Sequence, residues 1–85
     1  MDKETVKLFL NIRSRSTIFF NDYCDAVSST NEVGPFDILP FHINFICIIS
    51  DYLHVYEGDN RKVDMKISQG ILKVQDNRVL IFLDV

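Results

Sequence analysis

Apolar and polar residues alternate along much of this chain, and this alternation is the strongest constraint on its fold. The pattern covers residues 6–13, 63–67, 72–75 and 79–84. A period of two is typical of strands with one buried and one exposed face, whereas a helix would show a period of about 3.6 residues. No long window shows the helical period, and Ala26 is the single alanine in a chain dominated by β-branched and aromatic residues. The sequence therefore predicts strands and no helix.

Short polar stretches separate these segments. Gly58-Asp59-Asn60 and Asp76-Asn77 lie between alternating runs and predict hairpin turns. Further breaks are expected at Asn21-Asp22, at Ser50-Asp51 and across the polar stretch 28–34. Strands this short, joined by turns this frequent, favour a β-sandwich or barrel.

The length of the chain, 85 residues, suits a single domain with one core. We therefore expect an all-β fold over residues 1–85, a single β-sandwich of about nine or ten short, mainly antiparallel strands. No apolar segment approaches the ~20 residues that a membrane-spanning helix needs, and the charged start does not resemble a signal peptide. These features predict a soluble protein.

Charge and cysteine content narrow the function classes. The net charge is −3 and the basic residues are scattered, so we expect no nucleic-acid partner. Cys24 and Cys47 lack the spacing of a metal site and are expected to be small buried thiols, although a disulfide between them stays possible.

Catalytic chemistry has little support in the sequence. Asp22, Asp25 and Asp37 have no evident partner base, and no glycine-rich phosphate loop or nucleophile motif occurs. His42 and His54 could form a zinc site with the cysteines, but their spacing does not support one, and His54 is expected to face solvent. We therefore expect no catalytic residues, metal, cofactor or small-molecule substrate. A small metalloenzyme or hydrolase is the least favoured class.

Residues 34–45, GPFDILPFHINF, predict a corner between two layers. Gly34 allows backbone angles closed to other residues, while Pro35 and Pro40 limit strand pairing. His42 lies at the bend, where a hydrogen bond to nearby backbone is expected rather than a ligand. The following residues 43–49 are almost continuously apolar, so this strand is expected to be covered on both faces.

This corner also carries a family resemblance. Residues 34–42 resemble the G-x-x-x-x-x-P-x-H segment of the epsilon subunit of F-type ATP synthases. Residues 67–79 are similar to a second segment of that family, and the opening strand 8–14 with Ile18-Phe19-Phe20 to a third. Phe41 and Gln69 stand where the family usually has glycine, and Ser50-Asp51 replaces its usual Pro-Gly turn. Within residues 1–85 we expect no C-terminal helical domain.

The resemblance implies a rotor role. It implies a non-catalytic subunit of the central stalk that links the gamma subunit to the membrane c-ring and supports proton-coupled ATP synthesis. Its place would be peripheral, at the cytoplasmic face of the inner membrane. The implied partner-facing residues are Asn11, Arg13 and Ser14 toward gamma, and Thr30, Asn31, Glu32, Gly34, Pro35, Pro40, Phe41 and His42 toward the c-ring and the foot of gamma.

Surplus apolar residues support an interface but leave an alternative open. Phe9, Phe41, Leu80 and Phe82 fall on strand faces or turns where an isolated domain would prefer polar residues. Phe9 and Phe82 could instead close the second side of a two-layer core. The alternative function is a free-standing β-sandwich interaction module unrelated to ATP synthesis.

Overall fold

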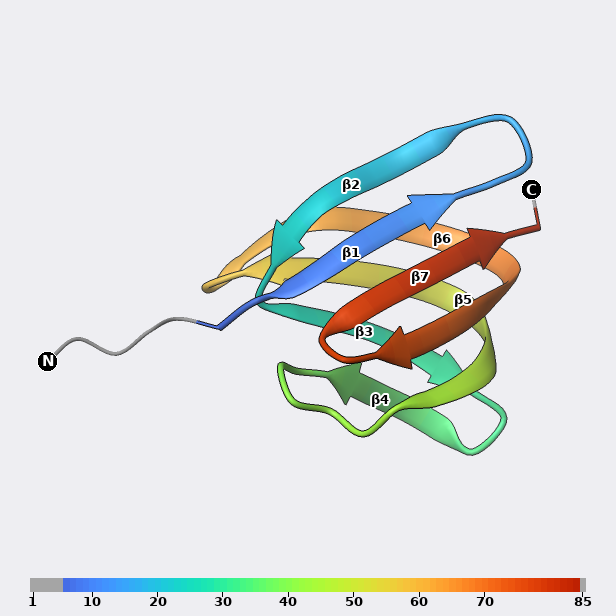
Figure 1. Ribbon diagram of the computed structural model, residues 1–85. Helices are drawn as coiled ribbons and strands as arrows, with labels where there is room; N and C mark the ends of the chain where they lie inside the picture. Colours follow the sequence, from blue (N-terminus) through green and yellow to red (C-terminus); the bar gives the residue numbers. More distant parts are fainter. Residues whose placement is uncertain (1–5, 85) are drawn as a thin grey trace, which may run out of the picture.

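A computed structural model describes residues 6–84, and all of its regular elements are strands (Figure 1). No helix in this part of the chain is long and apolar enough to cross a membrane. The seven strands are β1 (Leu8–Arg13), β2 (Ile18–Cys24), β3 (Ala26–Asn31), β4 (Gly34–Ile38), β5 (Phe45–Glu57), β6 (Asn60–Gln75) and β7 (Arg78–Leu83).

These strands form one hydrogen-bonded sheet in the order β2-β1-β7-β6-β5-β3-β4. Every neighbouring pair is antiparallel except β1 and β7, which run parallel. The all-β, mainly antiparallel fold is confirmed, and the turns at Gly58 and at Asp76-Asn77 are where the sequence predicts them.

The expected number of strands was too high because three predicted breaks lie wholly or partly inside strands. Asn21-Asp22 lies inside β2, and Ser28 to Asn31 belongs to β3 rather than to a loop. Ser50-Asp51 lies within β5, where the pairing with β6 shifts and Asp51 takes a φ of 76°. An acidic residue that tolerates positive φ therefore makes a bulge and not a turn.

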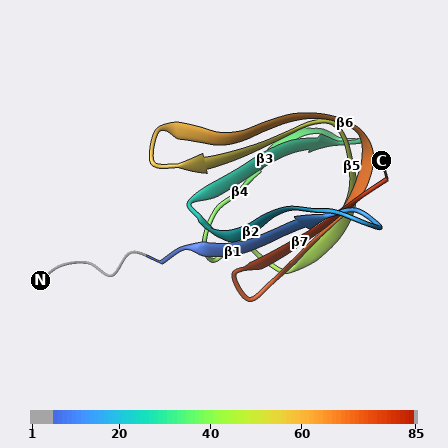
Figure 2. The same ribbon diagram turned by 90° about the horizontal axis from the view of Figure 1, so that it is seen from above.

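The long strands β5 and β6 bend, so that one sheet folds over into two layers (Figure 2). Residues 45–49 of β5 pair with residues 70–74 of β6, beside β7. Residues 51–57 of β5 pair with residues 60–67 of β6, beside β3. We call β2, β1, β7 and the first of these paired segments the first layer. The second paired segment, with β3 and β4, is the second layer.

The core lies between the layers and contains the inward-facing residues of the alternating segments. Each of these side chains is almost fully buried: Leu8, Leu10, Ile12, Cys24, Val27, Ile38, Ile49, Leu53, Val55, Ile67, Leu72, Val74, Val79, Ile81 and Leu83. Burying a side chain of this size contributes roughly 1.5–3 kcal/mol, so this set supplies most of the driving force for folding.

The prediction that residues 43–49 are covered on both faces is wrong. Ile46 and Ile48 are 65% and 57% exposed, whereas Phe45, Cys47 and Ile49 face the core. The strand lies in a folded sheet with one core, and nothing within residues 6–84 packs on its outer side. Phe82 is likewise 45% exposed and does not close a second core.

Candidate protein-interaction surface

The outer side of the first layer carries apolar side chains on each of its strand segments. In the sheet register, Ile48 is opposite Ile71, Ile71 is opposite Phe82, and Phe9 is opposite Tyr23. Residues directly opposite each other in a sheet share a face, so this group crosses all five strand segments. We call it the apolar face; it consists of Phe9, Tyr23, Ile46, Ile48, Ile71, Leu80 and Phe82.

Most of these side chains are open to solvent. Exposure ranges from 44% at Leu80 to 65% at Ile46, and Phe9 is half-buried against Tyr23 with ring centroids 5.0 Å apart. Single exposed apolar residues are ordinary, but a group of this extent on one face is typical of a binding surface. The apolar face is therefore the strongest candidate for a partner contact.

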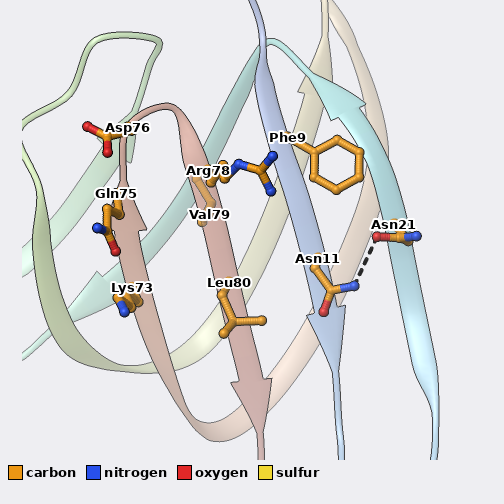
Figure 3. A pocket seen from close by; sticks show the side chains of 9 residues that line it. All are labelled: Phe9, Asn11, Asn21, Lys73, Gln75, Asp76, Arg78, Val79 and Leu80. Carbon is orange, nitrogen blue, oxygen red and sulfur yellow. Dashed lines mark hydrogen bonds between the residues drawn. The ribbon is translucent and has the colours of Figure 1, made fainter.

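A hollow of about 510 Å³ opens in this surface between β6, β7, β1 and β2 (Figure 3). Beside it the Asn11 amide donates a hydrogen bond of 3.0 Å to Asn21 Oδ1, while Asn11 Oδ1 is buried and has no partner within residues 6–84. The hollow is lined by Phe9, Asn11, Asn21, Lys73, Gln75, Asp76, Arg78, Val79 and Leu80. It is large enough to accept side chains of a docked protein.

The expected gamma-contact residues divide between this surface and the interior. Asn11 and Arg13 are in β1 and point to the outer side of the first layer. Ser14 is 5% exposed, and its backbone N–H donates to the Thr17 carbonyl at 2.8 Å. Ser14 therefore shapes the β1–β2 turn and offers almost no surface to a partner.

The expected c-ring residues lie in two separate places. Thr30 to Pro35 form the β3–β4 hairpin, in which Asn31 Oδ1 accepts hydrogen bonds from the backbone of Val33 at 2.8 Å and Gly34 at 3.2 Å. Pro40, Phe41 and His42 form the corner after β4, at its opposite end (Figure 1). The sequence analysis assigned both groups to the same partners, whereas the length of β4 separates the hairpin from the corner by about 15 Å or more.

The corner is fixed by contacts with the β6–β7 turn and with its own backbone. The Phe41 N–H donates to Asn77 Oδ1 at 2.6 Å, and the His42 N–H donates to the Leu39 carbonyl at 3.1 Å. His42 Nδ1 lies 2.9 Å from the Ile43 carbonyl oxygen, and its ring lies against Phe45. His42 is thus a corner histidine bonded to backbone, as predicted.

Phe41 has a strained backbone conformation. Its φ is 69°, a left-handed conformation that costs a residue with a Cβ about 1–2 kcal/mol. The ring is 75% exposed, so the strain is not offset by burial within this chain. An exposed aromatic residue held in a strained conformation is typical of a functional contact.

Phe41→Gly is expected to be more stable than Phe41→Ala by about 0.5–1 kcal/mol, because both remove the ring and only glycine avoids the left-handed cost. Urea unfolding of the two variants measures this difference. The same pair of substitutions at Phe82, which is in a regular strand, is the control and should favour alanine. Glycine being the less stable choice at both positions would contradict the strain at Phe41.

The outer side of the second layer has a different character. Tyr52, His54 and Tyr56 form an aromatic row, with Tyr52 and His54 stacked at 4.6 Å. His54 is on the outer side of its strand, as predicted, but it is partly covered: its Nε2 lies 3.2 Å from Asp64 Oδ1 and its side chain is 19% exposed. Arg61 lies over the Tyr56 ring and bonds Asp64. This side satisfies its own polar groups.

The thiols and acids do not form a reactive site. Cys24 and Cys47 are free, and burial raises the pKa of Cys24 to about 11 and also raises the pKa of Cys47, so both stay protonated at neutral pH. Within residues 6–84, no group of three or more His, Cys, Asp or Glu side chains could hold a metal ion. Cys47 is half-buried rather than fully buried as predicted.

The sequence missed several members of the apolar face. Tyr23 was assigned to the region after a turn, and Ile46, Ile48 and Ile71 were not recognised as outward-facing. These residues could have been found by pairing the apolar run 45–49 with the alternating segment 70–74. The residues of the apolar run that lie opposite outward-facing residues of the alternating segment must then face outward too.

Comparison with known proteins finds a matching family, a relative in sequence and similar solved structures. The family described as "ATP synthase, Delta/Epsilon chain, beta-sandwich domain" matches residues 7–85. An ATP synthase epsilon chain from Trichlorobacter lovleyi is 26% identical over 78 residues, which is 92% of this chain and 56% of that protein. The chain therefore spans about half the length of this curated relative.

Solved structures agree on the fold. A chain in the Euglena gracilis mitochondrial ATP synthase, solved as OSCP/F1/c-ring, superposes with a TM-score of 0.83 and 20% identity, covering 96% of this chain and 53% of that one. A chain in the central stalk and c-ring of the Tetrahymena thermophila mitochondrial ATP synthase gives a TM-score of 0.79 and 13% identity, covering 98% and 67%. At these identities the likeness concerns the fold alone.

Proposed function

This chain belongs to the family of ATP synthase delta/epsilon chains, through their β-sandwich domain, and on that premise we propose that it is a rotor subunit of an F-type ATP synthase. In this role it links the gamma subunit to the membrane c-ring and supports proton-coupled ATP synthesis without catalysing a step itself. Its location is peripheral, at the cytoplasmic face of the inner membrane. The role uses the β-sandwich alone.

The observation that carries this proposal is the apolar face, because a member of this family with an uncovered sheet face has a surface suited to a large partner. We assign the apolar face, with Asn11 and Arg13, to the gamma subunit. The hairpin Thr30 to Pro35 and the corner Pro40 to His42 are assigned to separate contacts with the c-ring and the foot of gamma. Family membership favours this role over an interaction module unrelated to ATP synthesis.

Binding to the gamma subunit tests the proposal. The chain and a gamma subunit from the same organism, each purified and shown to be folded, are expected to co-migrate in size-exclusion chromatography as a one-to-one complex. Cytochrome c or another unrelated folded protein of similar size serves as the negative control. Two folded proteins that migrate independently at micromolar concentration would overturn the proposed role.

A further inference from the structure

Within the strand segments of the first layer, the charged residues that face outward are all basic. Arg13 is opposite Phe82, Lys73 is opposite Leu80, and Arg78 is opposite Phe9 in the sheet register. The other outward-facing residues of these segments are apolar or uncharged. The chain as a whole has 12 acidic and 9 basic residues, so the basic character belongs to this side and not to the protein. The nearest acid at the hollow is Asp76, in the turn at its edge (Figure 3).

None of these cations forms an ion pair within residues 6–84. Elsewhere Arg61 pairs with Asp64 at 3.2 Å and Lys62 pairs with Glu57 at 3.2 Å, both at the second layer, whereas Arg15 and Lys66 have no ion pair within residues 6–84. Water solvates an unpaired cation at little cost while the surface is free. When a partner covers it, the charge loses that solvation and needs a carboxylate.

The positions of the three cations among the apolar residues indicate where a bound partner needs acidic groups. Lys73 and Arg78 lie on adjacent strands near the β6–β7 turn, and the Arg78 side chain extends toward β1 beside Phe9 (Figure 3). Arg13 lies four residues along β1 from Phe9, or about 13 Å away. Leu80 lies between Arg78 and Arg13 along the strands, and Phe82 lies directly opposite Arg13.

We infer that the partner which covers the apolar face presents apolar side chains with carboxylates among them, which meet Lys73 and Arg78 near the β6–β7 turn and Arg13 beside Phe82. This rests on the proposed function, in which the partner is the gamma subunit, and it adds the chemistry of the gamma surface. Opposite charges also steer the two proteins together, so association is faster at low salt than a purely apolar contact would allow.

Charge reversal with matched controls tests the inference. Lys73→Glu and Arg78→Glu each weaken binding to the gamma subunit at least tenfold in 50 mM salt, mainly through slower association, as measured by surface plasmon resonance. In 500 mM salt the difference shrinks, because screening shortens the reach of the charges. Lys73→Gln, which only removes the charge, gives a smaller loss than Lys73→Glu.

The controls reverse a charge on the other side of the sandwich. Lys66→Glu is matched to Lys73→Glu, since both lysines are exposed and lie in β6, one in each layer. Its affinity should stay within twofold of the wild type, and circular dichroism should show every variant folded. Equal losses for Lys66→Glu and Lys73→Glu, or no loss for either, would overturn the inference while the proposed function stands. A wild-type chain that does not bind gamma would overturn both.

Discussion

Gly70→Val is expected to remove much of the stability of this protein. A Cβ at Gly70 would lie 2.9 Å from Leu83 Cδ2 and 3.0 Å from the Phe82 carbonyl oxygen. The carbonyl cannot retreat without disturbing the pairing of Gly70 with Leu83. Overpacking a core position costs about 1–3 kcal/mol or more, and a domain of this size has only about 4–13 kcal/mol in total. Urea unfolding followed by circular dichroism measures the loss.

Gln69→Val is the matched control, because it introduces the same valine side chain at the neighbouring residue. Gln69 is exposed, so its substitution should change the free energy of unfolding by no more than about 0.5 kcal/mol. A Gly70→Val variant with a wild-type unfolding midpoint would show that the β6 bend does not require glycine.

The double substitution Leu80→Ser/Phe82→Ser is expected to abolish most of the binding to the gamma subunit. Both residues lie at the centre of the apolar face and are only about half-buried in the free chain. Central apolar residues of an interface contribute about 2 kcal/mol or more each when covered, so each loss weakens binding roughly 30-fold. Titration calorimetry with the purified gamma subunit measures the change.

The free energy of unfolding of the double variant distinguishes a loss of binding from a loss of folding. The two side chains face outward, so the free energy of unfolding should fall by at most about 1 kcal/mol. Tyr56→Ser is the control, since it removes an aromatic side chain from the outer side of the second layer and should leave binding unchanged. A folded double variant with wild-type affinity would place the gamma subunit elsewhere on the molecule.

The fold could be predicted well wherever alternation was strict. Leu8, Leu10 and Ile12 are buried as the period of two requires, and so are Leu72 and Val74. The errors in strand boundaries arose where a residue typical of turns lies inside a long paired strand. Asp51 has the residue type of a turn but makes a bulge, because continuous pairing of β5 and β6 stabilises the strand on both sides of it. Local preferences cannot reveal such long-range pairing.

The surface was harder to predict than the core. Ile46 and Ile48 belong to an apolar run that predicts a strand buried on both faces. The sequence alone does not show that no layer packs on the outer face of this strand within residues 6–84. Ser14 was expected at a partner contact, yet its backbone bond to Thr17 closes the turn and buries it. Alternation with Leu10 and Ile12 predicted that Asn11 and Arg13 face outward, and they do, whereas their contact with a partner stays a prediction.

The folding of one sheet into both layers has a mechanical consequence. In a sandwich of two independent sheets, only side-chain packing resists sliding of one sheet across the other. In this protein the backbones of β5 and β6 cross from one layer into the other (Figure 2). A twisting load applied to one layer therefore passes to the other along covalent peptide bonds, and the joint stays stiff even where its side chains yield.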